Sequence, residues 1–261
     1  MLMRRSGSAR LGNKRGQAIL NELYFFLSIA VYFSLLLAAY RFFGKTGLFV
    51  WICVAMIVSN IEAAKLVTMF GVSVTLGNVV YGSTYLATDI LCEIYGQKEA
   101  NRTVMLGFFV TVAFVAMTQL TLLFVPAEGD FAHESLKTVF SITPRLTVAS
   151  IVTYLLMQRF DIWLYSLIRK KTGEKRLWLR NNLATITTQL LDSALFTMLA
   201  FTGVHPFGTV VELIFTTYFV KIIVSLADTP FLYLARKLKP VSDDRPQTRP
   251  PDAAAGRRGS A

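Results

Sequence analysis

Hydrophobic stretches of about 20 residues recur along most of this chain, separated by short polar segments. A stretch of that length crosses a hydrocarbon core of ~30 Å as an α-helix, because each helical residue advances ~1.5 Å. In lipid, every backbone polar group must be hydrogen-bonded within the protein, which leaves helices and closed barrels as spanning structures. The short alternating segments of a barrel are missing from the sequence. The chain is therefore predicted to be an all-α, polytopic membrane protein.

The composition agrees with a membrane protein and argues against a nucleic-acid partner. Hydrophobic residues make up 54% of the 261 residues and charged residues 16%, which is too apolar for one soluble globular domain. The net charge of +11 would suggest nucleic-acid binding in a soluble protein, but here the basic residues flank the apolar stretches. We expect the lipid bilayer to be the partner and expect no nucleic acid.

Seven spans form one predicted transmembrane domain over residues 21–239. They cover residues 22–42, 47–66, 72–95, 103–125, 146–168, 182–203 and 209–235. Residues 1–20 are basic and without periodicity, which predicts a disordered extension, and the proline-rich residues 240–261 predict a disordered cytoplasmic tail. A cleaved signal peptide is disfavoured, because the first apolar run has spanning length and no small-residue cleavage site follows it.

The basic residues of the loops predict the orientation. Most of them fall on one side of the seven spans, including Arg41, Lys45 and the cluster at residues 169–180, while the opposite side holds an acidic loop at residues 127–134. Because cytoplasmic loops carry the excess of Lys and Arg, we expect a bacterial inner-membrane protein with its C-terminus inside and its N-terminus outside. The basic residues 1–20 oppose this orientation, but the loop pattern sums over more of the chain.

The sequence lacks the parts of a metal centre or a common hydrolase. Two cysteines and two histidines occur, and neither type is spaced as metal ligands. The “GKT” at residues 44–46 is not a phosphate loop, because Ala39 stands where the first glycine is needed. Without HExxH or GxSxG, we expect no catalytic residues, no metal and no cofactor, and an integral membrane enzyme is the weaker alternative.

Several polar and charged side chains fall inside the predicted spans, where a charge costs at least ~3 kcal/mol on insertion scales. Asp192 and Lys221 lie near the middles of spans six and seven, and Asp89 and Glu93 lie one turn apart near the inner end of span three. The others are Asn60 in span two, Gln158 and Asp161 in span five, and Arg145 and Arg180 at the starts of spans five and six.

Two interpretations of these side chains stay open. They can neutralise one another or anchor helix ends at the membrane interface, as basic residues such as Arg145 and Arg180 commonly do. They can instead line a cavity for a flat polar solute, with carboxylates for its N–H edge, a cation or amide for its carbonyl and tyrosines for stacking. Asp89 is the deeper acid and the one expected to contact substrate or a proton, whereas Glu93 fits an anchor or structural partner equally well.

Five motifs follow one another along the chain at a spacing typical of one family. They are “SNIEAAK” (59–65), “ATDILCEIYGQKEANR” (87–102), “PRLTVASIVTYLLMQRFDIW” (144–163), “LWLRNNLATITTQLLDS” (177–193) and “YFVKIIVSLADTPFLYLARK” (218–237). Together they resemble the queuosine precursor transporter family, also called the vitamin uptake transporter-like family. The resemblance covers residues 21–236, nearly the whole predicted membrane domain.

The resemblance implies import of a 7-deazaguanine, such as 7-cyano- or 7-aminomethyl-7-deazaguanine or queuine, for queuosine in tRNA. It also implies a six-helix core like the substrate-binding subunits of energy-coupling-factor importers, with the first span as an extra helix. Uptake of another vitamin-like solute is the alternative. The driving force is left open between ion coupling, facilitated diffusion and an energising partner.

The resemblance also assigns the site residues. Substrate binding falls to Asn60, Asp89, Arg145, Gln158, Asp192 and Lys221, and proton coupling or support of the binding residues falls to Glu93 and Asp161. One departure is Ala184, where a serine is common. Either Asp192 with Lys221 or Asp89 with Asn60 would offer the carboxylate and the donor that a guanine-like edge requires.

Overall fold

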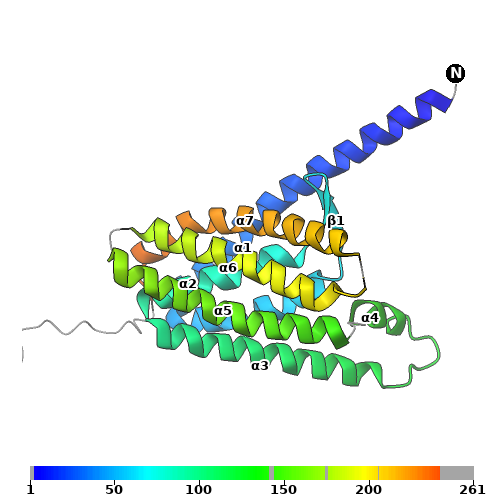
Figure 1. Ribbon diagram of the computed structural model, residues 1–261. Coiled ribbons are helices and arrows are strands. Elements are labelled where there is room, and N and C mark those ends of the chain that lie inside the picture. The colour runs from blue at the N-terminus through cyan, green and yellow to red at the C-terminus, as the bar shows by residue number, and fades with distance from the viewer. Residues whose placement is uncertain (1–2, 141–143, 174–175, 205, 242–261) are drawn as a thin grey trace, which may run out of the picture.

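The computed structural model describes residues 3–140, 144–173, 176–204 and 206–241, and long helices lying side by side make up most of it (Figure 1). The helices are α1 (Met3–Glu62), α2 (Gly77–Ile94), α3 (Gln97–Leu122), α4 (His133–Phe140), α5 (Pro144–Thr172), α6 (Leu177–Phe201) and α7 (Phe207–Lys237). Two short strands, β1 (Leu66–Met69) and β2 (Val72–Thr75), form an antiparallel hairpin beside α1. The all-α prediction is confirmed.

Helix α1 contains both of the first two predicted spans, folded back on each other at Gly44. This residue has φ 57° and ψ −135°, which is non-helical. The Tyr32 hydroxyl donates to Glu62 Oε1 at 2.9 Å. In a straight helix these residues would stand about 45 Å apart, so the two halves of α1 must run antiparallel.

The structure describes residues 3–20 near the beginning of the chain but not the residues from position 242 to its end. Residues 3–20 form the first turns of α1, where the sequence predicts a disordered extension. The predicted tail lies outside the described residues from position 242 onward.

Among the described residues, four helices are long and apolar enough to cross a membrane. They are the Ile19–Glu62 part of α1, and α3, α6 and α7. The chain is therefore a multi-pass membrane protein, while the count of seven spans stays a prediction. The predicted spans at residues 72–95 and 146–168 correspond to α2 and α5, which are more polar than the four helices above. Nearly all of α2 is buried, and a helix enclosed by other helices needs no apolar face toward lipid.

The borders predicted for spans two and three were wrong, because a hairpin lies between them. The segment “LVTMFGVSVT” pairs Leu66 with Thr75 and Met69 with Val72. Its turn uses Phe70 and Gly71, both at positive φ. The side chains of Asn21 and Glu22 hold the hairpin against α1, through the carbonyl of Thr68 at 3.0 Å and the amide of Phe70 at 3.0 Å.

Helix α4 was also missed, inside the loop that the sequence marks as acidic. Asp130 Oδ1 accepts hydrogen bonds from the backbone N–H groups of Ala132 at 2.7 Å and His133 at 3.3 Å. These bonds satisfy donors that the first turn of a helix leaves free. The helix lies alongside the end of α3 and next to the start of α5 (Figure 1).

The turn at Gly44 gives a first prediction. We expect Gly44→Ala to lower the free energy of unfolding by about 1–3 kcal/mol, because a residue with a Cβ is strained at this φ and ψ. Thermal unfolding of the purified protein in detergent measures the change. Gly208→Ala is the matched control, since a Cβ there would meet nothing within 4 Å. Equal melting temperatures for the two variants would contradict a strained turn at Gly44.

Candidate functional site

One face of α2 carries a row of polar side chains that runs along the interior of the bundle. Tyr81, Tyr85, Asp89 and Glu93 follow one another at four-residue steps, so they share a face of the helix and span about 18 Å along it. Polar side chains from α5, α6 and α7 reach this face. We call the whole set the polar track.

A lysine–aspartate pair occupies the Tyr81 end of the polar track. Asp192 of α6 and Lys221 of α7 form an ion pair, and both are buried. The hydroxyls of Tyr81 and Tyr85 donate to Asp192 Oδ1 at 3.1 and 3.3 Å. The Lys221 ammonium lies 5.4 Å from the centre of the Tyr81 ring. The carboxylate thus keeps one cation and two hydroxyl donors, which offsets the cost of burying it.

The next part of the track is an uncharged hydrogen-bonded group. The amide of Gln158 donates from Nε2 to Thr84 Oγ1 at 2.9 Å, and its Oε1 accepts from Thr88 Oγ1 at 3.3 Å. Gln158 and both threonines are almost fully buried. This arrangement links α5 to α2 and fixes the direction of the amide.

Buried carboxyl groups with few donors follow further along the track. Asp89 Oδ2 accepts from Thr185 at 3.4 Å, and Asp228 Oδ1 accepts from Asn181 at 2.7 Å. Asp161 has 0% exposure, and within the described residues neither of its carboxyl oxygens has a hydrogen-bond partner. Buried polar atoms without partners are rare, so this part of the track is suited to a bound molecule, water or a proton.

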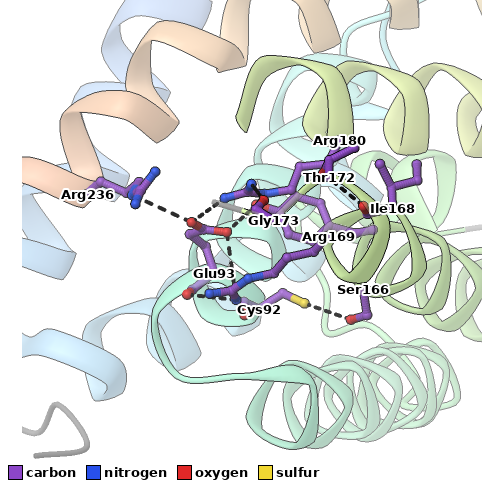
Figure 2. A network of polar contacts seen from close by, with 10 residues as sticks. Cys92, Glu93, Ser166, Ile168, Arg169, Thr172, Gly173, Arg180 and Arg236 are labelled. Atoms are coloured by element: carbon purple, nitrogen blue, oxygen red, sulfur yellow. Dashed lines mark hydrogen bonds and ion pairs between the residues drawn. The ribbon is translucent and has the colours of Figure 1, made fainter. Parts of the chain in front are cut away.

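Three arginines surround Glu93 at the other end of the track (Figure 2). Arg180 is fully buried and pairs with Glu93 Oε1. Arg236 reaches the same oxygen at 3.5 Å, and Arg169 reaches Oε2 at 3.8 Å. Tyr165 donates to Oε2 at 2.9 Å.

The arginines also hold backbone groups at this end. Arg169 donates to the carbonyls of Cys92 and Glu93 at 3.1 and 3.0 Å, which are among the carbonyls that the last turn of α2 leaves unpaired. Arg180 donates to the carbonyl of Gly173 at 2.8 Å. The backbone contacts of both arginines appear in Figure 2. The network therefore joins the ends of α2, α5, α6 and α7.

The structure brings together most, but not all, of the predicted site residues. Asp89, Gln158, Asp161, Asp192 and Lys221 line the polar track, and Glu93 closes it.

Asn60 is not joined to the track, and the side chain of Arg145 lies outside the described residues. The Asn60 side-chain amide donates to the carbonyl of Met56 in its own helix at 2.7 Å, so no hydrogen bond joins it to Asp89 in the described structure. Arg145 is the second residue of α5, and its side chain lies outside the described part.

Sequence reasoning missed the roles of several track residues. The sequence favours an interface anchor for Arg180 over a structural pair, but the structure buries this residue against Glu93. Tyr165, Asn181 and Asp228 were not assigned to the site. Tyr165 stands four residues after Asp161 and Asp228 stands seven after Lys221, so helical spacing was the available signal.

The residues of the track can bind a flat, polar molecule but show no metal centre. In the described part of the chain, no three His, Cys, Asp or Glu side chains are placed to hold a metal ion. Carboxylates, an ammonium group and an amide offer acceptors and donors, and Tyr81 lies among two other tyrosine rings, with centroids 5.7 Å from Tyr85 and 6.4 Å from Tyr154. Such a mixture has the donors, acceptors and rings that a heteroaromatic solute would require.

Comparison with known proteins gives two matches and confirms the resemblance seen in the motifs. Residues 75–235 match the family model described as “Putative vitamin uptake transporter”. The chain is also 39% identical over 226 residues to a protein of Bacillus subtilis (strain 168) named “Probable queuosine precursor transporter”. That alignment covers 86% of this chain and 98% of the relative. No solved structure matches the chain.

The arginine network gives a second prediction. We expect Glu93→Gln to lower the free energy of unfolding by about 3–5 kcal/mol, because the buried Arg180 would lose its counter-ion. Thermal unfolding in detergent measures the loss. Glu99→Gln makes the same change in a partly exposed pair with Lys45 at 3.3 Å, where about 0–1 kcal/mol is expected. Equal melting temperatures for Glu93→Gln and Glu99→Gln would show that the network does not stabilise the bundle.

Proposed function

The chain belongs to the vitamin uptake transporter family and is a transporter rather than an enzyme, and we propose that it imports a 7-deazaguanine precursor of queuosine. The observation that supports this cargo most directly is the buried pair of Asp192 and Lys221 with tyrosines around it. The name of the Bacillus subtilis relative points to the same class of cargo.

The chemistry of a 7-deazaguanine suits this pair. Its ring carries N1–H and an exocyclic amine side by side, which a carboxylate accepts with both oxygens, and its carbonyl needs a donor. Asp192 would take the N–H edge and Lys221 the carbonyl. Tyr81 would stack on the ring, since it already lies beside the Lys221 ammonium. Binding then separates the ion pair and gives each member a new partner.

The rival set from the sequence, Asp89 with Asn60, has weaker support. The Asn60 amide donates to the carbonyl of Met56 in its own helix, whereas Asp89 accepts from Thr185 of α6 on the track. In our proposal Asp89, Gln158 and Asp161 form the passage beyond the binding pair. Arg145 stays a proposed binding residue on the strength of the family resemblance alone.

We place the protein in the bacterial inner membrane with the C-terminus in the cytoplasm. The loop at residues 169–180 and the end of α7 carry most of the basic residues, which favours the cytoplasmic side for the arginine network. The polar track then leads from Asp192 and Lys221 inward to Glu93. A different vitamin-like solute would use the same passage, and complementation with supplied 7-deazaguanines distinguishes the two kinds of cargo.

Complementation tests the cargo. We expect this chain to restore queuosine in the tRNA of a bacterium that neither makes nor imports the precursors, when a 7-deazaguanine is supplied. Queuosine in hydrolysed tRNA is measured by mass spectrometry, and an empty vector is the control. Membrane-inserted protein that gives no queuosine with any of the three precursors would reject the proposal.

A variant of the binding pair tests the site. We expect Asp192→Asn to lower uptake of the labelled base at least about tenfold at equal protein abundance, because Lys221 would be left buried without its counter-charge. Asp130→Asn is the control, since Asp130 lies in an exposed loop and asparagine keeps an acceptor there. Full uptake by stable Asp192→Asn protein would remove Asp192 from the binding site.

A further inference from the structure

A cavity lies away from the polar track, between the two halves of α1 and the hairpin. It has a volume of about 280 Å³, and its lining includes Asn21, Tyr24, Phe25, Tyr32, Glu62 and Lys65. We call it the outer cavity, because the predicted orientation places these residues on the outer side of the membrane. None of its lining residues belongs to the polar track.

The walls of the outer cavity are held in place by specific contacts. Tyr32 donates to Glu62 Oε1 at 2.9 Å, which joins the two halves of α1 at this point. Asn21 and Glu22 fasten the hairpin to α1 through Thr68 and Phe70. Phe70 also packs edge-on against Phe25, with ring centroids 5.6 Å apart. These contacts fix the parts of α1 and the hairpin that line the cavity.

The lining repeats the chemistry of the central pair. Glu62 supplies a carboxylate and Lys65, three residues later, supplies an ammonium group of opposite charge. Tyr24, Phe25 and Tyr32 supply aromatic rings. Ligand cavities usually measure ~300–1,000 Å³, and the outer cavity is slightly smaller than this range, so it suits a small bicyclic base rather than a larger solute.

We infer that the outer cavity is a loading site, which binds the planar polar base before it reaches Asp192 and Lys221. This inference rests on the proposed function and on the predicted orientation. The base would place its N–H edge on Glu62 and its carbonyl near Lys65, and Tyr24 or Tyr32 would cover its ring. Two sites of matching chemistry on one path allow the base to pass between them without being fully rehydrated.

Thiol labelling tests whether the cavity faces outside and holds the base. Ser28→Cys places a thiol in the lining, and Val67→Cys places one in the hairpin wall as a second reporter. Thr138→Cys, exposed on α4, is the control. Intact cells are treated with a membrane-impermeant maleimide, with and without 7-cyano-7-deazaguanine, and labelling of Cys53 and Cys92 in the parent protein is subtracted as background.

We expect the base to slow labelling at positions 28 and 67 but not at position 138. Protection should persist when Asp192→Asn is added, because the outer cavity does not use that carboxylate. Labelling that the base never slows would overturn the inference, whether the cavity is empty or filled by lipid. Labelling only in permeabilised cells would overturn it too, because the cavity would then face inward.

Transport kinetics provide an independent readout. Glu62→Gln should raise the KM for uptake about tenfold with little change in the maximal rate, since a loading site contributes binding rather than release. Glu134→Gln removes a carboxylate from an exposed pair with Lys137 and should change neither value. An unchanged KM in Glu62→Gln would overturn the loading site alone. Failure of the parent protein to restore queuosine would instead reject the proposed function.

Discussion

A carboxylate enclosed by helices is stable only when cations or hydrogen-bond donors surround it, and Glu93 meets this constraint with contributions from four helices. Its partners come from α5, α6 and α7, while Glu93 itself ends α2. Arg180, which is fully buried, in turn needs this carboxylate, whereas Arg169 and Arg236 are partly exposed. The mutual dependence fixes the ends of these helices relative to one another, and the polar track can keep its geometry because its end is closed.

The buried acids along the polar track differ in how many cations and hydrogen-bond donors surround them. At Glu93, three arginines share one acid; at Asp192, one lysine and two tyrosine hydroxyls neutralise one acid. Between them, Asp89, Asp161 and Asp228 have hydroxyl or amide donors or no partner at all among the described residues. The strongly paired end serves stability. Under the proposed function, the weakly paired middle is where a moving solute would exchange contacts at low cost.

The sequence predicts what depends on local pattern and misses what depends on neighbours. Apolar length predicts the helices, and intramembrane charge singles out Asp192, Lys221 and Asp89, which the structure buries. The hairpin was missed because “LVTMFGVSVT” is apolar enough to merge with the spans beside it. Arg180 was misread because its position at a helix start resembles an interface anchor, and only packing against α2 reveals its partner. The same limit applies to Asn60, because its side-chain amide donates to a backbone carbonyl of its own helix.

The burial of α2 has a consequence for how the protein is made. Its polar residues keep it out of the set of helices apolar enough to span a membrane, and nearly all of its surface is covered by other helices. Such a segment gains little from lipid, so its stable insertion depends on neighbours. Helix α1 precedes it during synthesis, but Arg180, Lys221 and Arg236 are translated much later. The acids of α2 therefore lack these cations until α6 and α7 have been synthesised. Stable assembly of the N-terminal part of the chain thus depends on its C-terminal part.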